Sequence, residues 1–237
     1  MEVYLDVVKG FAHDLSLKLF SKARSVATPI NVIIGANVVA FVTFKIYWNS
    51  LDWARVKKEY MMLSRKNIRE KRYSSMIGSL FMHVDVFHLV RNMYGLYMFA
   101  PALTRCLKPT ALVGLYLSAG IAGGFASLAY HSWVPGAGIP ASQSVGADDA
   151  GCGASGAIMG LVGYVCVRYP GVGITSPLIK VPLPAFVFGS VFFAEAFDKM
   201  YKGYAPGEKR IGDAAHAGGF LLGTTFGVLH INGLVKC

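Results

Sequence analysis

A serine and a histidine, each flanked by small residues, lie at the heads of two apolar runs of the sequence. Ser155 lies in the tetrapeptide GASG at residues 153–156, and His216 lies in the pentapeptide AHAGG at residues 215–219. A serine beside a histidine is the minimum requirement for a hydrolytic nucleophile, because a neutral imidazole can accept the hydroxyl proton. Polar groups at bilayer depth are costly and usually functional. The two residues are therefore candidates for nucleophilic chemistry, provided that two helices bring them together.

The apolar run that follows Ser155 has a face made of glycine. Gly156, Gly160 and Gly163 recur at spacings of four and three residues, a pattern typical of close helix packing in membranes. Ser155 lies one residue before this stripe, at the expected helix N-terminus, where unpaired backbone N–H groups and the helix dipole favour a developing negative charge. Such donors stabilise the oxyanion of an acyl-transfer reaction. The alternative is that GASG is only the small-residue start of a packed helix.

The run that contains the histidine has a matching pattern. His216, Gly219 and Gly223 are spaced i, i+3 and i+7, which places them on one helical face. If this face packs against the glycine face after Ser155, the imidazole reaches the serine hydroxyl; the alternative is an isolated histidine at the membrane interface. Asp213 suits either the third member of a catalytic triad or a helix N-cap, and we favour the N-cap. The residues expected to allow close packing at this site are Gly153, Gly156, Gly219 and Gly223.

A third group of polar residues lies in an earlier apolar run. His88 and Asn92 are four residues apart, so both face the same way on a helix. Two side-chain N–H donors on one face suit an oxyanion hole; the alternative is interhelical hydrogen bonding. Arg91 lies beside them and either extends to the interface or pairs with an acidic residue such as Glu195 or Asp198.

The other titratable side chains suggest neither a metal site nor a cofactor site. His83 precedes the run of His88 and is expected to line the entrance to the site, whereas the remaining histidines are interpreted as incidental. The four cysteines form no CxxC pair, so we expect no metal centre, and no cofactor is expected. The cysteines are Cys106, Cys152, Cys166 and Cys237.

Composition places the chain in a membrane. Of its 237 residues, 54% are hydrophobic and only 15% are charged, with a mean hydropathy of +0.47, whereas an ordinary soluble domain has about 25% charged residues. The net charge of +10 comes from basic residues in connecting segments, which we interpret as topology and lipid-headgroup signals rather than a nucleic-acid surface. A transporter is disfavoured, because no apolar run carries a chain of ionisable residues.

Six apolar runs predict an all-α membrane protein with six transmembrane helices. Each run is near the ~20 residues that a helix needs to cross a bilayer. Residues 1–28 are expected to form an amphipathic helix on the membrane surface, the alternative being a leader with no fixed structure; residues 29–237 form the six-helix domain. The predicted connections are a basic stretch over 52–73, a loop over 134–151 and a polar loop over 198–210. The predicted spans are 30–48, 86–103, 110–133, 153–168, 181–197 and 213–231.

The pair His88 and Asn92 on span two, GASG at 153–156 on span four and AHAGG at 215–219 on span six together resemble the motifs of the rhomboid intramembrane serine proteases. The closer likeness is to the mitochondrial branch typified by the presenilins-associated rhomboid-like protease. Three stretches carry it: HLVRNMYGLYMF at 88–99, LYLSAG at 115–120 and GASGAIM at 153–159. Trp53-Ala54-Arg55 is not the Trp-Arg pair of bacterial members, and Met159 replaces their tyrosine; both departures are shared with the mitochondrial branch. Members of that branch usually carry an extra N-terminal span, which we do not find here, so we expect an internal targeting signal.

The resemblance implies a fold, an activity and a set of roles. It implies a six-helix rhomboid fold and an intramembrane endopeptidase in the mitochondrial inner membrane, with transmembrane proteins as substrates and no nucleic-acid partner. It implies Ser155 as nucleophile, His216 as general base without an acidic third member, and His88, Asn92 and the Ser155 backbone N–H as oxyanion donors. The alternative is a catalytically silent rhomboid-like scaffold, or a subunit that contacts other subunits of a larger membrane complex.

Overall fold

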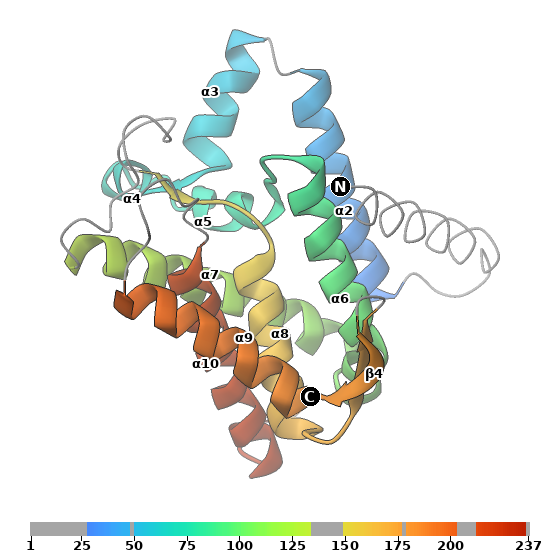
Figure 1. Ribbon diagram of the computed structural model, residues 1–237. Helices are drawn as coiled ribbons and strands as arrows, with labels where there is room; N and C mark the ends of the chain where they lie inside the picture. The colour runs from blue at the N-terminus through green and yellow to red at the C-terminus, as the bar shows by residue number, and fades with distance from the viewer. Residues whose placement is uncertain (1–27, 48–49, 134–148, 177–178, 203–211, 236–237) are drawn as a thin grey trace.

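The computed structural model describes residues 28–47, 50–133, 149–176, 179–202 and 212–235 as a helical bundle with two small two-stranded sheets (Figure 1). The amphipathic helix expected over residues 1–28 lies, apart from its last residue, outside the described residues. The helices are α2 (Pro29–Ile46), α3 (Leu51–Tyr60), α4 (Arg65–Arg69), α5 (Ser74–Gly78), the 3-10 helix η1 (Ser79–Phe81), α6 (Val86–Cys106), α7 (Pro109–Trp133), α8 (Ser155–Arg168), α9 (Ala185–Lys202) and α10 (Asp213–Ile231). The strands are β1 (Leu63–Ser64), β2 (Asp149–Gly151), β3 (Gly173–Ser176) and β4 (Ile179–Pro184).

A helix occurs at each of the six predicted spans, but the helices differ in their capacity to cross a membrane. By length and hydropathy, three of the described helices are long and apolar enough to span: Pro29–Ile46, Pro109–Tyr130 and Asp213–Ile231. The apolar helix α8 is shorter, with 14 residues. The structure thus supports a mostly helical membrane protein, while the count of six spans stays a prediction.

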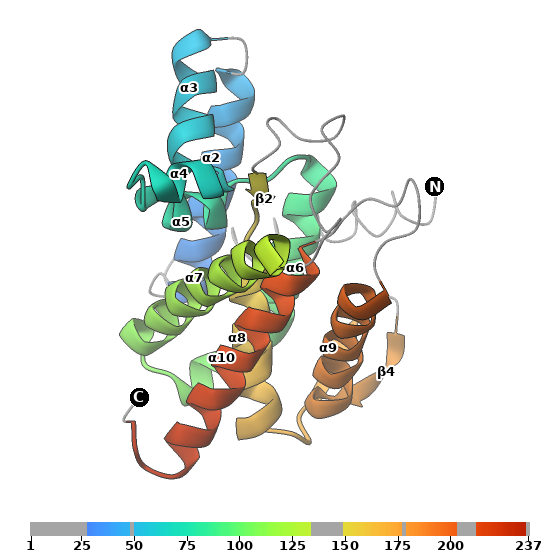
Figure 2. The ribbon, with the colours of Figure 1, turned by 90° about the vertical axis from the view of Figure 1, so that its left-hand side faces the viewer.

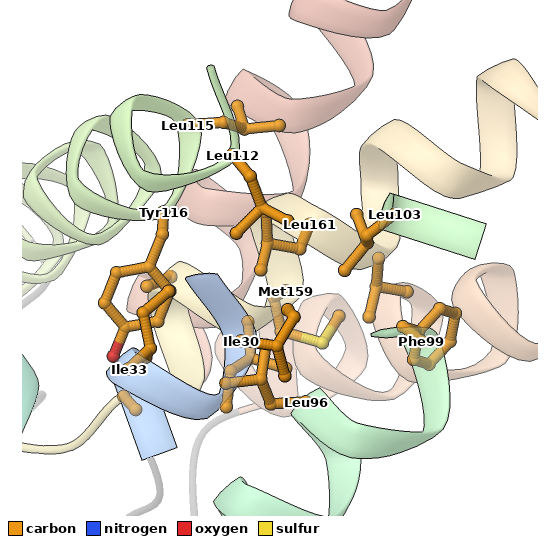
Figure 3. Packing of buried hydrophobic residues seen from close by; sticks show 14 of the residues in the cluster. Ile30, Ile33, Leu96, Phe99, Leu103, Leu112, Leu115, Tyr116, Met159 and Leu161 are labelled. Atoms are coloured by element: carbon orange, nitrogen blue, oxygen red, sulfur yellow. The ribbon is translucent and has the colours of Figure 1, made fainter. Parts of the chain in front are cut away.

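Helix α8 lies at the centre of the bundle. Every residue from Gly156 to Val165 is buried, and α6, α7, α9 and α10 all pack against this helix (Figure 2). Because all its faces are covered by protein, α8 carries its glycines towards neighbouring backbones rather than towards lipid. The apolar core is filled by side chains of α2, α6, α7 and α8, including Ile30, Leu96, Leu112 and Leu161 (Figure 3).

Three predictions at the connecting segments were wrong: the loop over 134–151, the start of the fifth span and the loop over 198–210. The basic stretch over 52–73, predicted as a connection, forms most of α3, then β1 and α4. The end of the predicted loop over 134–151 is strand β2, which pairs antiparallel with β1; residues 134–148 lie outside the described residues. The fifth span was predicted to begin at Val181, but Pro182 and Pro184 belong to β4, which pairs with β3. Helix α9 begins only at Ala185 and continues to Lys202, into the segment predicted as a polar loop.

Candidate active site

Ser155 is the first residue of α8, and the segment before it is held by the end of the first connection. The backbone N–H of Gly153 donates to the carbonyl of Ser79 over 2.8 Å, and Ser79 and Ala154 are both buried. No side chain of the described residues caps the N-terminus of α8, so its first N–H groups are available to other acceptors. The half-buried Ser155 therefore lies where the dipole of a central helix favours negative charge.

His216 lies one turn inside α10 and meets this serine. Its Nε2 is 2.8 Å from Oγ of Ser155, and its side chain is 19% exposed. The contact depends on close packing of α8 and α10: a side chain on Gly219 would collide with the carbonyl of Gly156, and one on Gly223 with that of Gly160. Glycine on both helices thus brings the serine and the histidine within hydrogen-bond distance.

Asp213 does not have the position that the sequence predicted. Gly212 is the N-cap of α10, and Asp213 is its first helical residue, so the N-cap prediction was wrong. The buried carboxylate lies in the first turn, where the helix dipole favours negative charge. Its Oδ1 is 3.9 Å from Nδ1 of His216, too far for a hydrogen bond.

His88 and Asn92 come together beside Gly153. A Cβ added to Gly153 would lie 2.8 Å from Nε2 of His88 and 3.6 Å from Nδ2 of Asn92. Gly153 also has a φ of +127°, which L side chains rarely adopt. Glycine is needed here for both reasons, although Gly153 precedes α8 and packs against an imidazole rather than a helix backbone. The carboxylate of Asp85 caps α6 by accepting from the backbone N–H of His88 over 2.7 Å.

His83 does not lie at the entrance that the sequence predicts for it. Its ring is 1% exposed and lies behind Asn92 rather than at an entrance, with its Nε2 2.8 Å from Nδ2 of Asn92. Burial lowers the pKa of His83 to about 4, with a contribution from His88, against smaller opposing effects of the Phe81 carbonyl and of Asp85. The cap at Asp85 was also missed, although an aspartate directly before an apolar run is a known signal for a helix start.

Arg91 lies between the two oxyanion candidates in α6, and its side chain is exposed. Its two suggested partners pair within α9 instead, Glu195 with Lys199 at 2.9 Å and Asp198 with Lys202 at 2.7 Å. Among the described residues, no three potential metal-ligating side chains come together, and the described cysteines form no disulfide with one another.

The arrangement brings together a hydroxyl, an imidazole and several N–H donors at the N-terminus of a central helix. A Rhomboid domain matches residues 70–233, more than half of the chain. The chain belongs to the rhomboid family. All the residues described above, from Ser79 to Gly223, lie inside the matched range.

Curated relatives place this rhomboid in the presenilin-associated rhomboid-like branch. RHOMBOID-like protein 12, mitochondrial, of Arabidopsis thaliana is 27% identical over 193 residues, which cover 80% of this chain and 55% of the relative. Rhomboid protein 1, mitochondrial, of Saccharomyces cerevisiae is 28% identical over 198 residues, covering 84% and 52%. Presenilin-associated rhomboid-like protein, mitochondrial, of Rattus norvegicus is 32% identical over 151 residues, covering 63% and 36%. The chain spans about half the length of these relatives or less. Its apolar helices and its mitochondrial relatives make it an integral membrane protein of mitochondria.

Proposed function

We propose that this rhomboid is an intramembrane serine endopeptidase of the mitochondrial inner membrane that cleaves transmembrane-helix substrates with a Ser155–His216 dyad. The observation that carries the proposal is the 2.8 Å separation between Nε2 of His216 and Oγ of Ser155. A hydroxyl and an imidazole at this distance form the unit of nucleophile and base that acyl transfer requires. The 3.9 Å between His216 and Asp213 favours a dyad over a triad.

In the proposed reaction, Oγ of Ser155 attacks the scissile carbonyl while Nε2 of His216 takes the hydroxyl proton. The oxyanion of the tetrahedral intermediate accepts hydrogen bonds from the Ser155 backbone N–H and from the side chains of His88 and Asn92. His216 then gives its proton to the leaving amine, which breaks the peptide bond and leaves an acyl-enzyme. Water hydrolyses the ester, with His216 again acting as base.

The length of α8 supports chemistry below the membrane surface. With 14 residues, α8 is about 21 Å long, whereas the hydrocarbon core of a bilayer is about 30 Å thick. If the C-terminal end of α8 lies near one face, Ser155 lies several ångströms below the other. In this proposal α2, α6, α7, α8, α9 and α10 form the six spans, and the short central helix depends on its neighbours to cover it.

The proposed entry for a substrate helix is between α6 and α9. Helix α9 packs mainly on α8 and α10, and its Phe188 ring meets Phe99 of α6 at 5.5 Å between centroids. Movement of α9 away from α6 would open a path to Ser155. The substrate helix must unwind locally to expose its peptide bond, and glycine near the cleavage site lowers that cost.

The experiment that tests the proposal is cleavage of a single-span substrate in liposomes that resemble the inner membrane. Its transmembrane segment carries glycine and alanine near one membrane face. We expect cleavage by the parent protein, and no cleavage by Ser155→Ala or His216→Ala. Joining α6 to α9 by a crosslink is expected to stop this cleavage. Cleavage that persists in Ser155→Ala would contradict the proposed nucleophile, and a parent protein that cleaves nothing would favour a catalytically silent rhomboid-like subunit.

A further inference from the structure

His83 makes a specific contact with the proposed oxyanion hole, but it has no role in the mechanism above. It lies in the short link between η1 and α6, and its ring is almost fully buried, with 1% exposed. Its Nε2 is 2.8 Å from Nδ2 of Asn92, and its ring meets that of His88 edge-on at 4.9 Å between centroids. His83 therefore touches both side chains that are proposed to bind the oxyanion.

The chemistry of the two groups fixes the direction of this hydrogen bond. A carboxamide nitrogen donates hydrogen bonds and does not accept them, so Nε2 of His83 must be the acceptor and Nδ2 of Asn92 the donor. A neutral imidazole has one N–H, which is then on Nδ1 of His83. The second hydrogen of Nδ2 stays available, and Nδ2 lies beside Gly153 together with Nε2 of His88.

The other ring nitrogen of His83 is buried and poorly paired. Nδ1 makes no hydrogen bond of good geometry with a described group, although the backbone carbonyl of Phe81 interacts with the ring. Buried polar atoms are normally fully paired in folded proteins, so a poorly paired nitrogen calls for an explanation. A phenyl ring would fill the same space without this nitrogen. What histidine supplies here, and phenylalanine would not, is the acceptor atom that faces Asn92.

We propose that His83 is a positioning residue that holds the Asn92 carboxamide with Nδ2, and not Oδ1, towards the oxyanion. Without an acceptor at this place, the amide can turn and present its carbonyl oxygen, which repels an oxyanion. This inference rests on the proposed function, because it assigns His83 a role only if Asn92 stabilises the oxyanion of an attack by Ser155.

The test is the rate at which a fluorophosphonate labels Ser155 in detergent-purified protein. Asn92→Ala is expected to slow labelling about 100-fold, the usual effect of removing one oxyanion donor. His83→Phe, which keeps the ring but has no acceptor, is expected to slow labelling at least about 10-fold. His83→Gln, whose amide oxygen can accept from Asn92, is expected to stay within about threefold of the parent.

The decisive measurement combines the two sites. In the Asn92→Ala background, His83→Phe is expected to slow labelling less than about twofold, because the group that it positions is already gone. His230→Phe is the matched control. His230 also hydrogen-bonds a buried side chain, that of Tyr164, over 2.8 Å. Tyr164 lies in the second half of α8 and His230 near the end of α10, so neither is next to Ser155 in its helix or to His216. This control is expected to lower thermal stability and to leave the labelling rate unchanged.

Three results separate the possibilities. If the parent is not labelled, the proposed function itself fails. If the parent and His83→Phe are labelled equally fast, the positioning role is wrong. It is also wrong if adding His83→Phe to Asn92→Ala slows labelling by the same factor as His83→Phe does alone. If His83→Phe does not fold, His83→Met replaces it as the apolar substitution. In either case, a labelling rate of His83→Gln as low as that of Asn92→Ala contradicts the inference.

Discussion

Gly223 of α10 lies so close to the carbonyl of Gly160 in α8 that no side chain fits between the two backbones. The same close approach recurs one turn earlier, between Gly219 and Gly156, which follows Ser155 directly. The interface that brings His216 to Ser155 is thus set by residues that have no side chain and take no part in the chemistry.

Gly223→Ala is expected to force α10 away from α8. The added methyl group has no space, so we expect a loss of about 1–3 kcal/mol in the free energy of unfolding, and a fluorophosphonate labelling rate at least about 10-fold lower, since misplacement by an ångström is costly in catalysis. Gly114→Ala in α7 is the control, because no atom of the described residues lies within 4 Å of the added Cβ; it should stabilise the helix slightly. Unchanged labelling in Gly223→Ala would show that the close contact does not position the pair.

Gly153→Ala separates backbone strain from damage to the proposed oxyanion hole. Gly151 and Gly153 both have positive φ, at +114° and +127°, but an added Cβ meets no atom of the described residues at Gly151 and meets His88 at Gly153. Both alanine variants are therefore expected to lose about 1–2 kcal/mol of stability. Only Gly153→Ala is expected to slow labelling, by about 10-fold or more. Equal labelling rates for the two variants would rule out a role for His88 at this position.

The buried His83 predicts an acid-sensitive fold. Its pKa is lowered from 6.5 to about 4, so between these pH values the unfolded chain binds a proton that the folded protein does not. Stability therefore falls as the pH falls from 6.5 towards 4, by about 3 kcal/mol at most. The groups that face this ring are His88 and Asp85, and both stay in place in His83→Gln. Equilibrium unfolding at pH 7 and pH 4.5 should show a smaller acid loss in His83→Gln than in the parent; an equal loss contradicts the assignment.

Asp213→Asn tests whether the site works as a dyad. Because Oδ1 of Asp213 is 3.9 Å from Nδ1 of His216, we expect the labelling rate to change less than about threefold. The corresponding substitution in a serine protease triad costs about 10⁴-fold in kcat. Glu195→Gln serves as a control for removal of an acidic residue elsewhere in the bundle. A loss of 100-fold or more in Asp213→Asn would require Asp213 to be a third member of the site.

The long apolar helices could be predicted from the sequence, whereas the structure of the connections between them could not. Long apolar runs with glycine at helical spacing indicate packed helices, and the predicted bounds of 213–231 agree with those of α10. Strands β1 and β2 are two and three residues long, too short for a recognisable alternation. The predicted span 181–197 puts Pro182 and Pro184 in the first turn of a helix, where proline is tolerated; instead they lie at the end of strand β4, and the helix follows.

The site shows the same division. The spacing of His216, Gly219 and Gly223 limits the partner of the histidine to a helix with a small-residue face, and the chain has such a face directly after Ser155. The contact between His83 and Asn92 has no such signal, because it joins a link to a helix face nine residues later, and its geometry depends on how η1 ends.

The most direct test of the account is covalent labelling of the purified protein with a serine-directed fluorophosphonate, beside Ser155→Ala and His216→Ala, with the site located by mass spectrometry. One adduct is expected, on Ser155 of the parent, and none in either variant. An unlabelled parent, under conditions in which a bacterial rhomboid is labelled, or an adduct that persists in His216→Ala at the parent's rate, would contradict the proposed serine–histidine dyad.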